Sequence, residues 1–221
     1  MDFHSAIYLI GLVAVFFFAL SGALAAAKRE LDILAFIFVG TVTGIGGGTF
    51  RDLLLNTEQV FWVADQRYLV VCVVGSAMTY FFAHRVVQID RVLQWIDAAS
   101  IAMFAVLGTI KALDYNAPIS VAILMGVMTS TLGSAIRDMM LQQKLMIFEP
   151  EIYVTACLLG SASYVALQYL GVEEISAILL ASAAAFALRV LAFELDLRFP
   201  HYKLSRLQNR EIRKQKYKNL N

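Results

Sequence analysis

Seven apolar stretches, each about 20 residues long, follow one another along the chain and constrain its fold more than any other feature. They occupy residues 5–27, 33–55, 68–86, 92–113, 117–141, 151–171 and 174–195, with short charged or turn-like segments between them. A segment of this length matches the hydrocarbon core of a bilayer, where a backbone must satisfy its own hydrogen bonds. We therefore predict an all-α polytopic membrane protein with seven transmembrane helices.

Composition and charge agree with this class. Of the 221 residues, 60% are hydrophobic and 16% are charged, a balance too apolar for a soluble domain of this length. Lys and Arg gather in alternate loops and in a tail, residues 198–221, that has eight basic residues and one acid. By the positive-inside rule, we predict a cytoplasmic C-terminus and an N-terminus outside. We expect the basic tail to contact anionic lipid, and we expect no nucleic acid partner.

The second half of the chain repeats the first half. When the sequence is shifted by 86 positions, uncommon residues coincide in order, including Arg51 with Arg137 and Asp52 with Asp138. We therefore predict a first three-helix repeat in residues 1–91, a second in residues 92–173, a seventh transmembrane helix in residues 174–197, and the basic tail. Because each repeat crosses the membrane three times, the second must be inverted relative to the first. Folds of this kind place a binding or permeation site near the midplane.

The sequence TGIGGGTFRD, residues 43–52, marks this place in the first repeat. Three consecutive glycines weaken a helix, so we expect a break or kink that opens backbone groups toward water or protein. Thr49 and Asp52 would then form a capping box on a restarted half-helix. The second repeat has the single Gly133 opposite the glycine run, and we expect its helix to bend less.

Small and hydroxyl-bearing residues recur on both elements. The hydroxyl groups belong to Thr43, Thr49, Thr129, Ser130, Thr131 and Ser134. Hydroxyls and freed carbonyls can replace part of the water shell of a cation. The alternative interpretation is that the small residues only let the helices pack closely.

Both elements end in an Arg-Asp pair. Charged side chains within membrane spans usually face a cavity or a partner. We predict that Arg51 and Arg137 each pair with Asp52 or Asp138, that one pair lies near each membrane face, and that the pairs gate or brace a pore. Two other charges receive simpler interpretations. We expect Lys111 to extend to the interface from a helix end and Asp97 to lie at the headgroup level.

Two three-helix repeats, each with a Gly-rich second helix that ends in Arg-Asp, resemble the prokaryotic trimeric intracellular cation (TRIC) channels, also described as glycine-transporter-like (UPF0126-type) membrane proteins. The resemblance covers about residues 5–195, and GIGGGTFRD is its most specific motif. It implies a homotrimer with one pore in each protomer, between the two Gly-rich helices, permeable to potassium and other monovalent cations. It also implies the plasma (inner) membrane of a bacterium or archaeon. By position, the resemblance assigns the two halves of the pore lining to Gly44, Gly46, Gly47, Gly48 and Thr49, and to Thr129, Ser130, Gly133 and Ser134.

The sequence also bears on two other function classes, a transporter and a membrane-embedded enzyme. An alternating-access transporter of a small solute such as glycine would use the same inverted-repeat arrangement. A membrane-embedded enzyme is disfavoured, because it would need a nucleophile–base pair or metal ligands within the spans, and there is no mid-span His or Cys–His set. We expect no cofactor and no tight metal site, only K⁺ or Na⁺ passing transiently.

Overall fold

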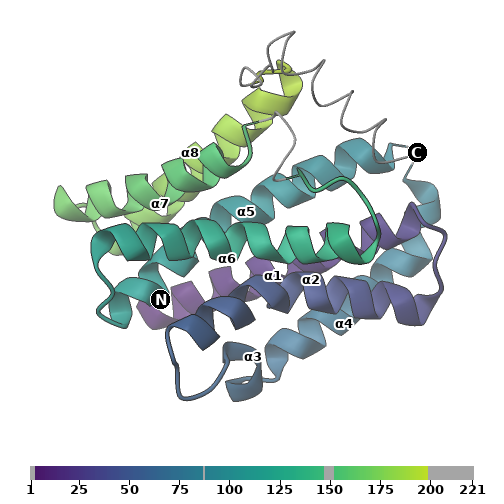
Figure 1. Ribbon diagram of the computed structural model, residues 1–221, viewed down its shortest axis with the longest axis horizontal. Helices are drawn as coiled ribbons and strands as arrows, with labels where there is room; N and C mark the ends of the chain where they lie inside the picture. Colours follow the sequence, from purple (N-terminus) through teal and green to yellow (C-terminus); the bar gives the residue numbers. More distant parts are fainter. Residues whose placement is uncertain (1–2, 87, 147–151, 199–221) are drawn as a thin grey trace, which may run out of the picture.

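Long helices make up most of the structure, a computed structural model that describes residues 3–86, 88–146 and 152–198. The elements, in chain order, are α1 (Phe3–Ala27), α2 (Ile33–Leu54), α3 (Phe61–Ala64), α4 (Arg67–Phe82), the 3₁₀ turn η1 (Ala83–Arg85), α5 (Ile89–Asp114), α6 (Ile119–Met140), α7 (Val154–Tyr169) and α8 (Glu174–Glu194). Figure 1 shows the long helices side by side, with α3 and α4 along one edge and α7 and α8 along the opposite edge. The chain is an all-helical integral membrane protein.

Six helices in the described part of the chain are long and apolar enough to cross a membrane. The predicted span at residues 68–86 is made by α4 and η1 together, residues Arg67–Arg85. The predicted span at residues 151–171 contains α7, which has 16 residues. A helix of that length extends only about 24 Å, less than the hydrocarbon core of about 30 Å. The count of seven transmembrane helices therefore stays a prediction.

The predicted break in the glycine run is wrong. Helix α2 continues from Ile33 to Leu54 without interruption. Thr49 is not an N-cap, because its hydroxyl donates a hydrogen bond of 2.7 Å to the carbonyl of Ile45 one turn earlier. The glycines serve close contacts with neighbouring elements, which offset their low helix propensity.

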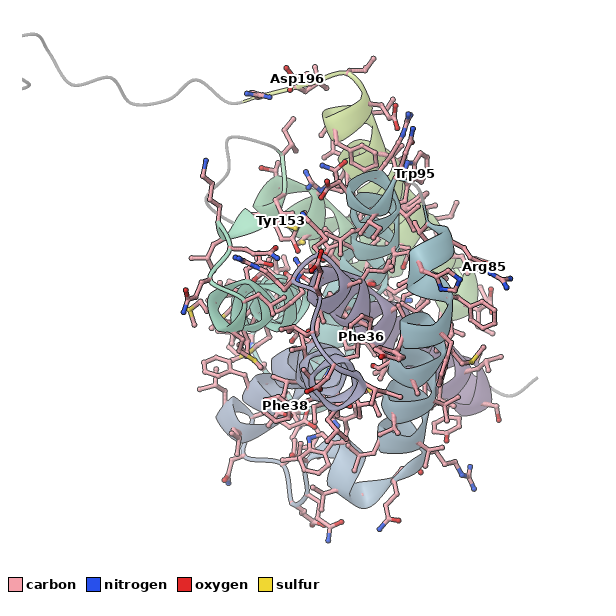
Figure 2. All side chains as sticks on the ribbon, turned by 90° about the vertical axis from the view of Figure 1, so that its right-hand side faces the viewer. Phe36, Phe38, Arg85, Trp95, Tyr153 and Asp196 are labelled. Atoms are coloured by element: carbon pink, nitrogen blue, oxygen red, sulfur yellow. The ribbon has the colours of Figure 1, made fainter. Side chains whose placement is uncertain are left out.

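Helices α1 and α5 form the centre of the bundle. The apolar window of α5 is 72% buried, whereas that of α4 is only 28% buried and that of α8 33%. The rings of Phe18 on α1 and Phe104 on α5 meet with their centroids 4.9 Å apart. On α2, Phe36 is 4% exposed and Phe38 is 61% exposed (Figure 2). This arrangement leaves apolar side chains of the outer helices available to lipid or to a neighbouring subunit.

The contact between the first two helices recurs 86 residues later. A Cβ atom on Gly22 would approach the Cα of Gly40 to 2.8 Å, so α1 and α2 are in backbone contact there. A Cβ atom on Gly108 would likewise approach the Cα of Gly126 to 3.0 Å, where α5 meets α6. The small residues at this spacing thus hold equivalent helix pairs together in the two halves.

The loops repeat as well. Outside glycine, five described residues have positive φ, and four of them fall into two pairs 86 positions apart. Glu30 and Asn116 have φ of 54° and 58°, and Asn56 and Gln142 have φ of 51° and 50°. These residues follow the C-termini of α1, α5, α2 and α6, so equivalent helices end in the same left-handed conformation.

Candidate functional site

The two Gly-rich helices cross in direct backbone contact. A Cβ atom on Gly133 of α6 would lie 2.6 Å from the carbonyl oxygen of Thr43 on α2. In the reciprocal position, a methyl group on Gly47 would overlap the carbonyl of Thr129. All four residues are buried. The residues predicted to face one another from the two repeats therefore do meet, and in this structure their backbones touch.

Hydroxyl groups around this crossing bond within their own helices. Thr43 and Thr129 donate to the carbonyls of Val39 and Met125 at 2.6 Å each. The other predicted hydroxyls, on Thr49, Ser130, Thr131 and Ser134, also contact carbonyls one turn earlier. Gly44 and Gly48 are buried, against the Cys72 sulfur and the Phe61 ring, and Gly46 meets the side chain of Ile136.

An ion pair ends each Gly-rich helix, as predicted. In the first, which we call the Arg51 cluster (Arg51, Asp52, Phe61 and Lys111), the Nε of Arg51 donates to Oδ1 of Asp52 at 2.8 Å. The other carboxylate oxygen accepts the backbone N–H of Phe61 at 2.8 Å and lies 3.5 Å from the ammonium nitrogen of Lys111. Lys111, expected to extend to the interface, instead turns toward this buried carboxylate.

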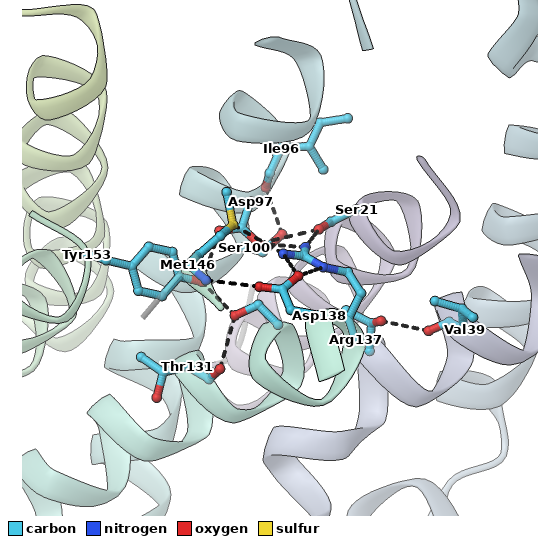
Figure 3. Close-up of polar contacts among 12 residues, drawn as sticks. Ser21, Val39, Ile96, Asp97, Ser100, Thr131, Arg137, Asp138, Met146 and Tyr153 are labelled. Carbon is cyan, nitrogen blue, oxygen red and sulfur yellow. Dashed lines mark hydrogen bonds and ion pairs between the residues drawn. The ribbon is translucent and has the colours of Figure 1, made fainter. Parts of the chain in front are cut away.

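The second ion pair belongs to a larger group, the Arg137 cluster (Ser21, Asp97, Arg137, Asp138, Met146 and Tyr153), shown in Figure 3. The Nε of Arg137 donates to Oδ1 of Asp138 at 2.8 Å, and its Nη1 lies 3.0 Å from Oδ1 of Asp97 and donates to the Ser21 hydroxyl. The free oxygen of Asp138 accepts the backbone N–H of Met146 at 3.1 Å, which mirrors the bond from Phe61 to Asp52.

Tyr153 completes the Arg137 cluster. Its hydroxyl donates to Oδ2 of Asp97 at 3.0 Å and lies 2.6 Å from the hydroxyl of Ser134. The prediction that Asp97 lies at the headgroup level is wrong, because its side chain is 1% exposed and is bound to Arg137. Packing of α5 against α1 and α6 carries this carboxylate into the bundle, where a charge requires a partner.

A cavity approaches each cluster, and the two cavities lie at opposite ends of the bundle. One, of about 520 Å³, is lined by residues near the end of α1 and the start of α5, and Arg137 and Asp138 form part of its wall. The other, of about 250 Å³, is lined by residues near the start of α1 and the end of α5, together with Arg51 and Lys111. The α2–α6 crossing lies between the two ends, since Arg51 and Arg137 stand near the C-termini of α2 and α6.

Beside the smaller cavity, the loop between α3 and α4 is hydrogen-bonded to α1. Tyr8, which lines it, donates a hydrogen bond of 2.8 Å to Asp65 in the segment between α3 and α4. The backbone N–H of Arg67 and the Tyr8 hydroxyl lower the pKa of Asp65, because both bonds favour the charged carboxylate. Asp65 is therefore ionised at neutral pH and connects α1 to this loop.

Charge differs between the clusters. The Arg51 cluster has one carboxylate and two cations, whereas the Arg137 cluster has two carboxylates and one cation. The difference comes from Asp97 and Lys111, whose positions 86 residues earlier are Gly11 and Ala25. Sequence reasoning missed both residues as members of the site, although a charge within an apolar span was the available signal.

The comparisons with known proteins agree with this geometry. The glycine transporter family model matches the chain twice, at residues 8–84 and 94–169. The chain belongs to this family of membrane proteins. The UPF0126 membrane protein of Vibrio cholerae is 33% identical over 206 residues, which cover 91% of this chain and 85% of that one. The UPF0126 inner membrane protein YadS of Escherichia coli is 33% identical over 200 residues, covering 90% and 97%.

Solved structures connect the family to channels. The TRIC trimeric intracellular cation channel orthologue from Rhodobacter sphaeroides is 40% identical, with a TM-score of 0.84 over 86% of this chain and 98% of that one. A prokaryotic TRIC channel in 0.5 M KCl is 26% identical, with a TM-score of 0.82 over 89% and 100%. The resemblance to prokaryotic TRIC channels that the sequence indicated is confirmed.

Proposed function

We propose that this protein is a potassium-permeable channel for monovalent cations, with one ion path per protomer between α2 and α6. The observation that carries the proposal is the placement of two cavities at opposite ends of the bundle, on either side of the Gly47–Thr129 crossing. One cavity reaches Arg137 and Asp138, and the other reaches Arg51. The likeness to TRIC cation channels supports it.

The path would pass the small residues of both helices. Its first half would be lined by Thr43, Gly44, Gly46, Gly47, Gly48 and Thr49, and its second half by Thr129, Ser130, Thr131, Gly133 and Ser134. Carbonyls and hydroxyls at these positions can replace part of the hydration shell of K⁺ or Na⁺. We assign the described structure to a closed state, since the backbones touch at the crossing. Opening requires α2 and α6 to separate there.

The same proposal includes the architecture. Seven transmembrane helices, two inverted three-helix repeats and a homotrimer would carry the path through the plasma membrane, with the N-terminus outside and no cofactor or catalytic activity. The contacts and loop conformations that recur 86 residues apart, and the two matches of one family model, support the repeats. The trimeric R. sphaeroides orthologue supports the assembly.

Planar-bilayer recording of the purified protein in asymmetric KCl tests the proposed function. A channel gives single-channel steps and a reversal potential near the potassium equilibrium. A protein that stays silent in the bilayer but takes up glycine robustly in vesicles would be a transporter, and the proposal would be wrong.

A further inference from the structure

The last helix, α8, contributes a buried cation. Arg189 is 1% exposed although two thirds of the apolar window of α8 is not buried. Its guanidinium carbon lies 4.9 Å from the ring centroid of Tyr153 and 5.8 Å from that of Phe193. An arginine at this depth is costly unless its surroundings stabilise the charge, so a residue of this kind usually has a role.

Tyr153 connects Arg189 to the Arg137 cluster. One face of its ring receives the guanidinium group, and its hydroxyl donates to Asp97 at 3.0 Å. Asp97 in turn binds Arg137. A cation over a tyrosine ring holds that ring in place, more strongly where water is excluded. Figure 3 shows Tyr153 reaching toward Asp97 from the side on which α8 lies.

In the described part of the first repeat, cations lie over phenylalanine rings, such as Arg51 over Phe61 at 5.8 Å, and none lies over the equivalent tyrosine. Beyond the loops that follow α2 and α6 the repeat offset falls to 85, so the residue equivalent to Tyr153 is Tyr68. The ring of Tyr68 lies against other aromatic rings, those of Phe61 at 4.9 Å and Tyr8 at 5.9 Å. Helix α8 follows the second repeat and packs on α5 and α7. Arg189 thus brings a positive charge from α8 to the ring of Tyr153.

We propose that Arg189 is a positioning residue that holds Tyr153 on Asp97 and thereby keeps the Arg137 cluster closed. The cluster joins α1, α5, α6 and the segment after α6 through one guanidinium group. Movement of α6 away from α2 at that end would therefore pull on these contacts, which hold α6 to α1 and α5. Helix α8 therefore raises the free energy needed to open the path, because Arg189 holds Tyr153 in place. This inference rests on the proposed channel function.

Single-channel recording of Arg189→Gln tests the proposal. We expect the open probability to rise about tenfold to thirtyfold, the range that loss of one desolvated cation–π contact implies, with the unitary conductance unchanged. Arg189→Lys gives an intermediate value, because an ammonium keeps the charge but not the planar stacking. Arg91→Gln is the matched control, since it removes an exposed ion pair of 2.8 Å between α5 and Glu194 of α8. It leaves the open probability unchanged.

Tyr153→Phe gives a second test that keeps the aromatic ring. We expect it to raise the open probability like Arg189→Gln, and the double variant to show no larger effect than either single one, because both act through one contact chain. An unchanged open probability in Arg189→Gln, an equal effect of Arg91→Gln, or additive effects in the double variant would overturn the proposal.

Amide hydrogen exchange separates this inference from the channel function. The backbone N–H of Met146 is bonded to Asp138 within the cluster. We expect its exchange to accelerate in Arg189→Gln and Tyr153→Phe but not in Arg91→Gln. A wild type without current would refute the channel function, and the exchange rates would then decide the positioning role alone. Unchanged exchange would overturn it.

Discussion

Arg137 joins four parts of the chain with one guanidinium group. It contacts Asp138 on its own helix, Asp97 on α5, Ser21 on α1 and the sulfur of Met146 after α6. Its side chain is 1% exposed. A buried charge with several good partners specifies one arrangement of the helices, because any other arrangement leaves it unpaired.

Removing one partner of Arg137 tests how much the cluster contributes to the stability of the fold. We expect Asp97→Asn to lower the free energy of unfolding by about 2–4 kcal/mol, since a buried charge loses an ionic partner. Asp90→Asn is the control. Asp90 pairs with Lys28 but its side chain is 77% exposed, so we expect a change of about 0–1 kcal/mol. Denaturant unfolding of the detergent-solubilised protein measures both, and equal losses would contradict the assignment.

Arg51 gives a prediction about conduction. It lies at the inner wall of the smaller cavity and is 6% exposed. We expect Arg51→Gln to change the potassium current severalfold, because the charge next to the path is altered. The exposed Arg67, at the same end of the bundle, is the matched control, and Arg67→Gln leaves the current nearly unchanged. Normal trimers of Arg51→Gln with unaltered conductance would make Arg51 a structural brace only.

At the scale of elements, the glycine run of α2 is a contact surface. Gly47 lies on the backbone of α6 and Gly48 on the Phe61 ring of α3. The indole nitrogen of Trp62 also donates to the hydroxyl of Thr49 at 2.9 Å, which attaches α3 to the same stretch. One turn of helix therefore carries both the α2–α6 crossing and the docking of α3.

Two neighbouring glycines differ in what they can accept. A methyl group on Gly47 would overlap the Thr129 carbonyl, whereas a Cβ atom on Gly46 meets only the terminal carbon of Ile136 at 3.1 Å. We expect Gly47→Ala to destabilise the protein by about 1–3 kcal/mol. Gly46→Ala is expected to be neutral or stabilising by up to about 1 kcal/mol, because alanine favours the helix. Thermal unfolding compares them, and the same melting temperature for both would argue against a tight crossing.

At the scale of the whole molecule, two similar halves carry opposite local charge. The Arg51 cluster has an excess of cations and the Arg137 cluster an excess of carboxylates, while the helix contacts around them repeat. Helix α8 stands outside the repeats and packs on α5 and α7. The two ends of the molecule therefore share helix contacts and loop conformations but differ in the charge of their clusters.

Orientation in the membrane follows from the basic loops and tail. We expect a fluorescent reporter at the C-terminus to be active in the cytoplasm and a periplasmic phosphatase at that position to be inactive, because Lys and Arg are retained inside. A fusion after residue 57, in the loop beyond α2, is the control and should report the opposite side. Periplasmic activity at the C-terminus would reverse the proposed topology.

Assembly gives a last prediction. Exposed apolar residues such as Leu34 and Phe38 leave surface for subunit contacts, and the proposed homotrimer has three times the 24.5 kDa chain mass. Native mass spectrometry from detergent or nanodiscs measures this. A monomer or dimer as the main species would contradict the proposed trimer.

The sequence by itself determined much of the architecture. The positions of α1, α2, α5, α6 and α8 and the pairing of Arg51 with Asp52 agree with the predictions. An apolar segment of about 20 residues has the length that crosses a bilayer, so the spans follow from local hydropathy. The repeat offset follows from comparing the two halves of the sequence. The family was also identifiable from its motif.

Tertiary structure alone decided how α2 uses its glycines and which charges meet. A run of glycines is compatible with a broken helix and with a close crossing, and only the carbonyl of Thr129 on the neighbouring helix selects the second. Asp97 and Arg137 are 40 residues apart, and Lys111 and Asp52 are farther still in the chain. Such encounters depend on how helices pack, and a local pattern contains no information about the packing partner.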